Sequence, residues 1–332
     1  MTYESVHAAP DGPGDARPTA MQIIEDEKLI NQWTDKVFMI TGGSSGIGIE
    51  TARAVYATGA HVYITARDVK KGQEVADEIK ASLPDSKGKI NVLNLELDSL
   101  HSVKDCAADF LSKSKQLNVL INNAGIMACP EGKTKDGFEL QFGTNHLGHF
   151  LLFQLLKPTL LASSTPSFHS RVVCLSSSAH KRSSVLLDDL DFSKSGYDPW
   201  KSYGQSKTAN IWMATEIERR YGSKGLHANA VHPGGIRTNL QRHMDPNIMK
   251  KMLDPYTKHM KSPEQGAATT VWAATAKQWE GTGGKFLEDC SISKPFNPET
   301  DSMLNGRAPH AYSPESAQEL WELSNKLVGT SD

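Results

Sequence analysis

The sequence predicts an α/β fold with a doubly wound parallel sheet, covered by helices on both faces. Short apolar runs rich in β-branched residues alternate with longer stretches that have helical spacing or propensity. Strands that alternate with helices of this length form βαβ units. No internal repeat or low-complexity linker follows residue 35, so a single domain over residues 35–295 is expected rather than two.

The expected elements follow in chain order. Buried strands are expected where the apolar runs are short, at 36–41, 61–65, 90–95, 118–122, 171–176 and 226–232. Helices are expected at 47–58, 70–82, 99–115, 137–162, 203–222 and 264–277, the last with Pro263 near its start. Residues 1–34 are expected as a partly disordered extension, because residues 1–20 are rich in Pro, Gly and charge. Residues 296–332 are expected as a C-terminal tail with a short helix.

Composition and charge limit the kinds of partner that the protein is expected to bind. A net charge of −2 over 332 residues offers no broad basic surface for nucleic acid, so a small-molecule partner is expected. Residues 1–20 lack the apolar core of a secretory signal, and the apolar run 149–162 is too short for a transmembrane segment. A cytoplasmic location is therefore expected. The cysteines have no CxxC spacing and indicate reduced, buried thiols rather than a zinc site: Cys106, Cys129, Cys174 and Cys290.

A glycine-rich turn, TGGSSGIG at 41–48, follows the first expected strand and opens a helix. Gly42, Gly46 and Gly48 let the chain turn sharply, let the backbone approach a pyrophosphate and let the helix pack closely. The sheet is therefore expected to be of the Rossmann type. A tight structural turn is the alternative, and a mononucleotide P-loop is disfavoured because no Lys-Ser/Thr pair follows.

Polar residues also end the fourth and fifth expected strands, as NNAG at 122–125 and SSS at 176–178. The carboxyl ends of parallel strands line one crevice, so these residues are expected beside the glycine turn. Alternatively, the asparagines close a turn and the serines form an ordinary loop.

Tyr203 and Lys207 lie four residues apart and would share one face of a helix. A free phenol titrates near pH 10, so a base active near pH 7 needs about 4 kcal/mol of selective phenolate stabilisation. A neighbouring cation supplies such stabilisation. The alternative is a surface Tyr–Lys pair on an amphipathic helix.

Taken in order, TGGSSGIG, NNAG, the serine after the fifth strand, YGQSK and VHPGGIRT resemble the short-chain dehydrogenase/reductase family over roughly residues 35–295. The segments around SSSAH, DDLDF and EQGAATTVWAAT resemble its retinol-dehydrogenase-like branch, in fungal members especially. The resemblance implies that Tyr203 is the catalytic acid or base and Lys207 its activator. It also implies that Ser177 binds the carbonyl and that Asn145 helps a proton relay.

The resemblance further implies an NAD(P)-binding catalytic domain. Lys207 would hold the nicotinamide ribose, and VHPGGIRT at 231–238 would lie over the nicotinamide. Glu96 stands where the family usually has Asp beside the adenine, so either Glu96 or Asp98 would make that contact. The full set of implied cofactor contacts is Gly42, Ser44, Ser45, Gly46, Ile47, Gly48, Arg67, Glu96, Asn123, Tyr203, Lys207, Ile236 and Thr238.

The end of the second strand bears on the choice of cofactor. Arg67 lies 19 residues beyond Gly48, where NAD-selective sites place a carboxylate, and a guanidinium suits a 2′-phosphate. NADP(H) is therefore expected rather than NAD(H). Lys70 and Lys71 either add positive potential or are solvated, and Asp68 would select NAD(H) if the strand ended later.

The expected activity is that of an oxidoreductase that interconverts a ketone or aldehyde and an alcohol on a small, apolar substrate. The alternative is a catalytically silent dinucleotide-binding regulatory or scaffold protein. Residues 240–260, with Met244, Met249, Met252 and Met260, are either a substrate lid or a surface helix. The apolar stretches 149–162 and 209–217 either form a homodimer face or are buried against the sheet.

Overall fold

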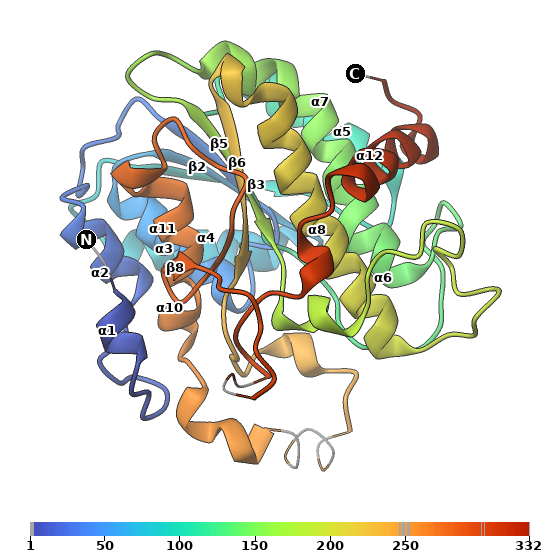
Figure 1. The fold of residues 1–332 in the computed structure, drawn as a ribbon. Coiled ribbons are helices and arrows are strands. Elements are labelled where there is room, and N and C mark those ends of the chain that lie inside the picture. Colours follow the sequence, from blue (N-terminus) through green and yellow to red (C-terminus); the bar gives the residue numbers. More distant parts are fainter. Residues whose placement is uncertain are drawn as a thin grey trace.

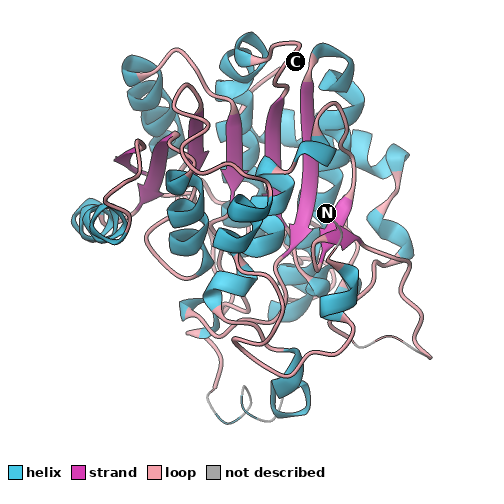
Figure 2. Ribbon diagram, turned by 90° about the vertical axis from the view of Figure 1, so that its left-hand side faces the viewer, coloured by secondary structure: helices cyan, strands magenta, loops and turns pink. Residues whose placement is uncertain are grey.

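The computed structural model describes residues 3–245, 247, 250, 253–299, 301 and 303–331. Within them, one eight-stranded sheet has the order β3-β2-β1-β4-β5-β6-β7-β8 (Figures 1 and 2). Its strands run parallel except β8, which pairs antiparallel with β7. Their bounds are β1 Val37–Ile40, β2 His61–Ala66, β3 Lys89–Asn94, β4 Val119–Asn122, β5 Ser170–Leu175, β6 Leu226–His232, β7 Phe286–Glu288 and β8 Ser291–Ile292.

The strand order confirms the doubly wound, single-domain Rossmann-type fold. β1 lies between β2 and β4, so the order of strands reverses at β1 and opens a crevice at the carboxyl ends there. Every expected strand is present, with ends within one residue of the expected ones. β7 and β8 were not expected, because runs of three and two residues carry no readable alternation.

Helices cover both faces of the sheet. One buried cluster joins β-strand side chains to α5 (Leu100–Lys113), α7 (Gly148–Ser163) and α8 (Pro199–Tyr221). A second cluster on the other face joins them to α3 (Ile47–Ala57), α4 (Val69–Ser82) and α11 (Ala268–Thr275). This two-sided burial explains why the strand sequences are almost continuously apolar.

Two of the expected helices are divided. Instead of one helix over 137–162, the chain forms α6 (Leu140–Phe142), a π-helical turn (Gly143–Leu147) and then α7. The Glu139 carboxylate accepts from the main-chain N–H groups of Gln141 and Phe142, which fixes the helix start at residue 140. The expected helix 264–277 is divided into α10 (Pro263–Gly266) and α11.

The expected disorder of residues 1–20 is wrong for residues 3–20. This segment contains α1 (Glu4–His7) and leads into α2 (Ala20–Asp26). Tyr3 is 6% exposed and its hydroxyl donates to Asp26, while Arg17 is 5% exposed. A Pro- and Gly-rich composition indicated disorder, but these two side chains find partners far along the chain that composition does not reveal.

The C-terminal helix α12 (Pro314–Val328) packs across α7 and α8. Trp321 lies edge-on against Phe150 and Phe153, which belong to the apolar stretch 149–162. On the same face, the Trp212 indole N–H donates to the His310 carbonyl. Most of both apolar stretches is therefore buried within this chain, against α12 as well as the sheet.

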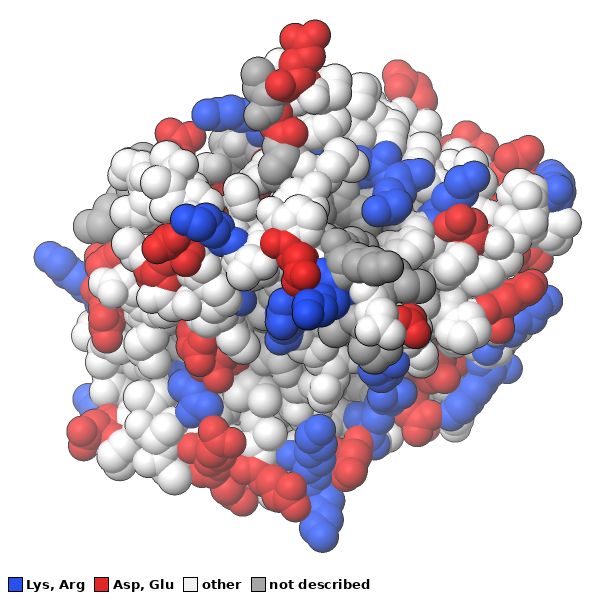
Figure 3. All heavy atoms as spheres, turned by 90° about the horizontal axis from the view of Figure 1, so that it is seen from below, with Lys and Arg blue, Asp and Glu red and all other residues white. Residues whose placement is uncertain are grey.

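None of the helices in the described part of the chain is both long and apolar enough to cross a membrane. Basic and acidic side chains are interspersed over the face at the bottom of Figure 1 (Figure 3), as expected for a chain with a net charge of −2.

Candidate active site

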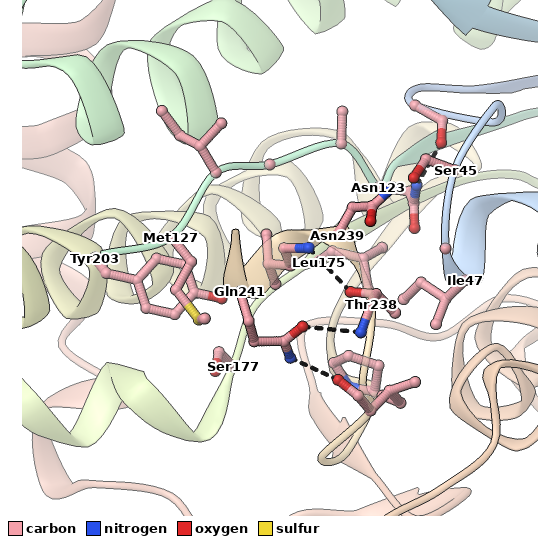
Figure 4. Close-up of a pocket in the computed structure, with 18 of the residues that line it drawn as sticks. Ser45, Ile47, Asn123, Met127, Leu175, Ser177, Tyr203, Thr238, Asn239 and Gln241 are labelled. Carbon is pink, nitrogen blue, oxygen red and sulfur yellow. Dashed lines mark hydrogen bonds between the residues drawn. The ribbon is translucent and has the colours of Figure 1, made fainter. Parts of the chain in front are cut away.

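A cavity of about 1360 Å³ opens at the carboxyl ends of the central strands. Its walls come from the glycine turn after β1 and from the loops that follow β2, β3, β4, β5 and β6. Figure 4 shows Ser45, Ile47 and Asn123 in one part of the cavity and Tyr203, Met127 and Ser177 in another. The cavity therefore joins residues that were predicted separately from five stretches of sequence.

The glycine turn has the backbone that its sequence predicted. Gly42 and Gly46 have positive φ values of 67° and 56°, a conformation that glycine adopts at little cost. A Cβ at Gly48 would lie 2.3 Å from the Gly42 carbonyl oxygen, so no larger residue fits there. The turn ends at Ile47, where α3 begins with its N-terminus beside the cavity.

Thr41 ties the glycine turn to the end of β4. Its hydroxyl oxygen accepts from the main-chain N–H groups of Asn123 (2.9 Å) and Ala124 (3.0 Å). The hydroxyl in turn donates to His149 Nε2 at 2.8 Å, because His149 Nδ1 donates to the Asn145 carbonyl. Burial lowers the pKa of His149 to about 4, which keeps the ring neutral. The sequence analysis missed this network, although Thr41 stands inside the glycine motif.

Tyr203 lies on α8 and points into the cavity, as does Ser177 (Figure 4). Burial raises the pKa of the Tyr203 phenol to about 12, and a hydrogen bond with Ser177 opposes that shift. The Ser177 oxygen also accepts from the Ala179 N–H at 3.1 Å. The phenol is thus fully protonated at neutral pH.

Lys207 lies one turn further along α8 and is 4% exposed. Its ammonium donates to the Leu175 carbonyl at 3.1 Å and sits 5.5 Å from the centre of the Tyr203 ring. Burial lowers the pKa of Lys207 to about 8. The expected lowering of the phenol pKa by this ammonium is absent from the structure, where burial outweighs every other influence on Tyr203.

Asn145 occupies the π-helical turn, completely buried. Its side-chain oxygen accepts from the Ile126 N–H, and its amide donates to the Ile126 carbonyl and to Ser206 Oγ, all within 3.0 Å. Ser206 stands on α8 between Tyr203 and Lys207. Asn145 therefore links the loop after β4 to the helix that carries both candidate catalytic groups.

Two of the three adjacent serines, Ser176 and Ser177, make different contacts. Ser176 is 3% exposed and its hydroxyl donates to the Lys207 carbonyl, so it fastens β5 to α8. Ser177 is the residue that caps the following 3-10 helix (Ser178–Arg182) and faces Tyr203. Both residues follow the end of β5 at Leu175 and line the cavity, but only the Ser177 hydroxyl bonds with Tyr203.

The loops after β2 and β3 form another wall of the cavity. Arg67 is exposed and lines it. Asp68 lines it as well, and its carboxylate also caps α4 by accepting from the Lys71 N–H. β2 ends at Ala66, so Asp68 belongs to the helix cap and not to the strand end. Glu96 and Asp98 both line the cavity, with Glu96 paired to Lys135, and the choice between them stays open.

The VHPGGIRT stretch lies against the glycine turn. Thr238 begins a short 3-10 helix, η4 (Asn239–Gln241), through a capping box with Gln241 (Figure 4). A Cβ at Gly46 would come within 3.3 Å of the Thr238 side chain, so the two loops meet there. Ile236 lines the cavity and is 7% exposed.

Comparison with known proteins decides the family. The family profile described as short chain dehydrogenase matches residues 36–248. The chain belongs to the short-chain dehydrogenase family. It is 52% identical over 332 residues to short-chain dehydrogenase/reductase prx1 of Penicillium roqueforti, covering 99% of this chain and 96% of that protein.

This dehydrogenase is also 38% identical to human retinol dehydrogenase 12, over 90% of this chain and 88% of that protein. Among solved structures, an uncharacterised protein of Mycobacterium paratuberculosis aligns with a TM-score of 0.68 at 32% identity. The alignment covers 95% of this chain and 99% of the bacterial protein. The predicted family, its retinol-dehydrogenase-like branch and the likeness to fungal members are confirmed.

Part of the segment 240–260 lines the dehydrogenase's cavity. A 3-10 helix, η5 (Asp254–His259), is followed by the buried Met260, and both Tyr256 and Met260 line the cavity. Met244 packs against the cluster around Tyr203. Met249 and Met252, which completed the expected pattern, lie outside the described residues.

The four cysteines of the dehydrogenase are free and buried. Among the residues that the structure describes, no group of three or more His, Cys, Asp or Glu side chains is placed to hold a metal ion.

Proposed function

We propose that this dehydrogenase interconverts a ketone or aldehyde and the corresponding alcohol, with NADP(H) as cofactor and Tyr203 as the acid or base. One observation carries the proposal. The Tyr203 phenol, the Ser177 hydroxyl and the Lys207 ammonium line a single cavity together with the glycine turn. The fit of a dinucleotide rests on the glycine turn. Gly42 and Gly46 line the cavity with backbone that carries no side chain, and a Cβ at Gly48 would meet the Gly42 carbonyl, so the turn can pack closely and expose its backbone to a pyrophosphate.

When bound, a nicotinamide cofactor supplies or accepts a hydride. The residues of this chain handle the proton and the oxygen. Ser177 would hold the carbonyl oxygen, and the protonated Tyr203 would donate its proton to that oxygen during reduction. A phenol pKa of about 12 keeps Tyr203 protonated at neutral pH, the form that donates during reduction, whereas oxidation of an alcohol requires the same group to accept a proton.

The other candidate residues would hold the cofactor. Lys207 would bind the nicotinamide ribose, Asn145 would assist the proton relay, and Arg67 would meet a 2′-phosphate. The remaining proposed contacts are Gly42, Ser44, Ser45, Gly46, Ile47, Gly48, Glu96, Asn123, Ile236 and Thr238, all of which except Gly48 line the cavity.

The proposed substrate is small and apolar. Met127, Trp200 and Leu240 line the cavity around Tyr203, and Leu140 and Met260 line it elsewhere. Apolar walls favour apolar ligands. The name of the human relative, retinol dehydrogenase 12, is that of an enzyme for an apolar alcohol. The cytoplasmic location and the homodimer stay predictions from the sequence.

The proposal is tested by mixing the protein with NADPH or NADH and a panel of decanal, cyclohexanone and retinal. We expect NADPH to be oxidised with at least one of these carbonyls. Formation of the corresponding alcohol is measured by chromatography. Binding of NADPH without turnover across a broadened panel would contradict the proposal and favour the silent, dinucleotide-binding alternative.

Arg67→Ala is expected to remove most of the preference for NADPH over NADH. A charge-assisted contact to a phosphate is worth about 1.5–3 kcal/mol, which corresponds to about 10- to 150-fold in affinity. Dissociation constants for both cofactors, measured from quenching of tryptophan fluorescence, give the ratio before and after substitution. Lys70→Ala is the control, because Lys70 is also exposed but starts α4 outside the cavity.

The assignment of Arg67 fails if the unmodified protein prefers NADH. It fails equally if Arg67→Ala weakens NADPH and NADH by the same factor.

A further inference from the structure

The N-terminal segment 3–19 contacts the segment that contains η5 and Met260 through one buried side chain. Figure 1 shows this blue segment beside the orange chain that carries η5, and the two are joined by hydrogen bonds from Arg17. The guanidinium donates to the carbonyls of His259 (2.9 Å) and Met260 (2.6 Å) and, at the limit of bonding distance, to Lys258. Its Nε donates to Asp15 at 2.8 Å. Arg17 stands more than 240 residues from Lys258, His259 and Met260 in the sequence.

The carbonyls that Arg17 binds are those at the end of a helix. η5 ends at His259, and the last carbonyls of a helix have no partner within it. A cation placed there satisfies these carbonyls and also lies at the negative end of the helix dipole. Arg17 therefore caps η5 from another part of the chain.

The guanidinium is itself held in place. Gln265 donates from its amide to the main-chain oxygens of Asp15 and Arg17, and it accepts from the Gly14 N–H. Gln265 is 2% exposed and belongs to α10, which packs on α3. The N-terminal segment is thus anchored to the main domain, and Arg17 extends from that anchor to η5.

The segment that Arg17 caps, η5 and the following Met260, contributes side chains to the cavity wall. Met260 is 3% exposed and lines the cavity, and its sulfur lies 2.9 Å from where a Cβ of Gly235 would be. The next residue, Lys261, donates its N–H to the Gly235 carbonyl at 2.8 Å. Tyr256, also a cavity residue, lies within η5. A shift of the helix end would displace both cavity side chains.

We propose that Arg17 is a positioning residue, through which the N-terminal segment holds Tyr256 and Met260 against the substrate. The substrate part of this inference rests on the proposed function, whereas the holding of η5 does not. Arg17 touches neither substrate nor cofactor in this scheme. Its loss should weaken substrate binding more than the chemical step.

The test compares Arg17→Ala with Arg17→Lys and with Lys258→Ala as the matched control. Lys258 pairs with Asp11 at 3.0 Å, which joins the same two segments, but both side chains are more than 70% exposed, and exposed pairs contribute little. With decanal and NADPH, we expect Arg17→Ala to raise KM by about tenfold while kcat changes by less than about threefold. Arg17→Lys should be intermediate, because an ammonium lacks the fork that reaches several carbonyls.

Hydrogen exchange provides a readout that needs no turnover. The Met260 and Lys261 amides should exchange at least about tenfold faster in Arg17→Ala, while the amides of α12 and the affinity for NADPH stay unchanged. Unchanged exchange at residues 258–261, or equal loss of protection throughout the chain, would overturn the inference. If the wild type reduces no carbonyl, the proposed function fails and the exchange result alone decides on Arg17.

Discussion

Tyr203→Phe is expected to lower kcat by about a thousandfold, because a positioned general acid contributes about 10²–10⁴ to rate. The substitution removes only the hydroxyl, so the ring continues to fill its buried position on α8. Affinity for NADPH should stay within about threefold, since the hydroxyl's proposed task is proton transfer and the variant keeps the ring that would contact the cofactor. Steady-state kinetics with decanal and a separate binding titration measure the two quantities.

Tyr63→Phe is the matched control for this substitution. Tyr63 is a buried tyrosine on β2 that does not line the cavity, and burial raises the pKa of its phenol as well. Its variant should retain wild-type kcat. Turnover of Tyr203→Phe within tenfold of wild type would rule out the proposed role.

The sequence predicted the residues of this site better than their electrostatics. Tyr203 and Lys207 share a face of α8 as their spacing requires, and the glycine turn bends sharply, with positive φ at Gly42 and Gly46. The pattern could not reveal that burial shifts both titrating groups away from their charged forms. That shift depends on how completely α7, α8 and the loops exclude water, which is a property of packing.

The parts of the fold that could be predicted are those that the local sequence determines. Short, nearly continuous apolar runs specified the central strands, whereas β7 and β8 depend on pairing with β6 and with each other. The division of 137–162 depends on one carboxylate, Glu139, whose partners are two main-chain N–H groups. The contacts of Arg17 could not be predicted for a related reason. Its acceptors are main-chain carbonyls, which residues of any type supply.

Lys207→Ala is expected to damage both turnover and cofactor binding. The variant removes a buried ammonium that is placed between the Leu175 carbonyl and the face of the Tyr203 ring. Loss of a charged group in contact with a ligand costs about 1.5–3 kcal/mol, so the dissociation constant for NADPH should rise about 10- to 150-fold. kcat should fall by at least about a hundredfold, because the nicotinamide ribose would lose the contact that positions it for reaction.

Lys201→Ala is the control for this variant, because Lys201 is an exposed lysine on the same helix and should leave both quantities unchanged. A fall in kcat with unchanged affinity for NADPH would contradict the proposed ribose contact.

The pH dependence of cofactor binding tests the same side chain without a substitution. The pKa of Lys207 is lowered by burial to about 8, so the side chain is charged below that pH and neutral above it. Attraction between Lys207 and the anionic cofactor is therefore present in the acidic range and is lost as pH rises through about 8. We expect the affinity of the wild type for NADPH to decrease across this interval, and we expect the decrease to be absent in Lys207→Ala. An affinity that falls equally in both proteins would assign the titration to another group.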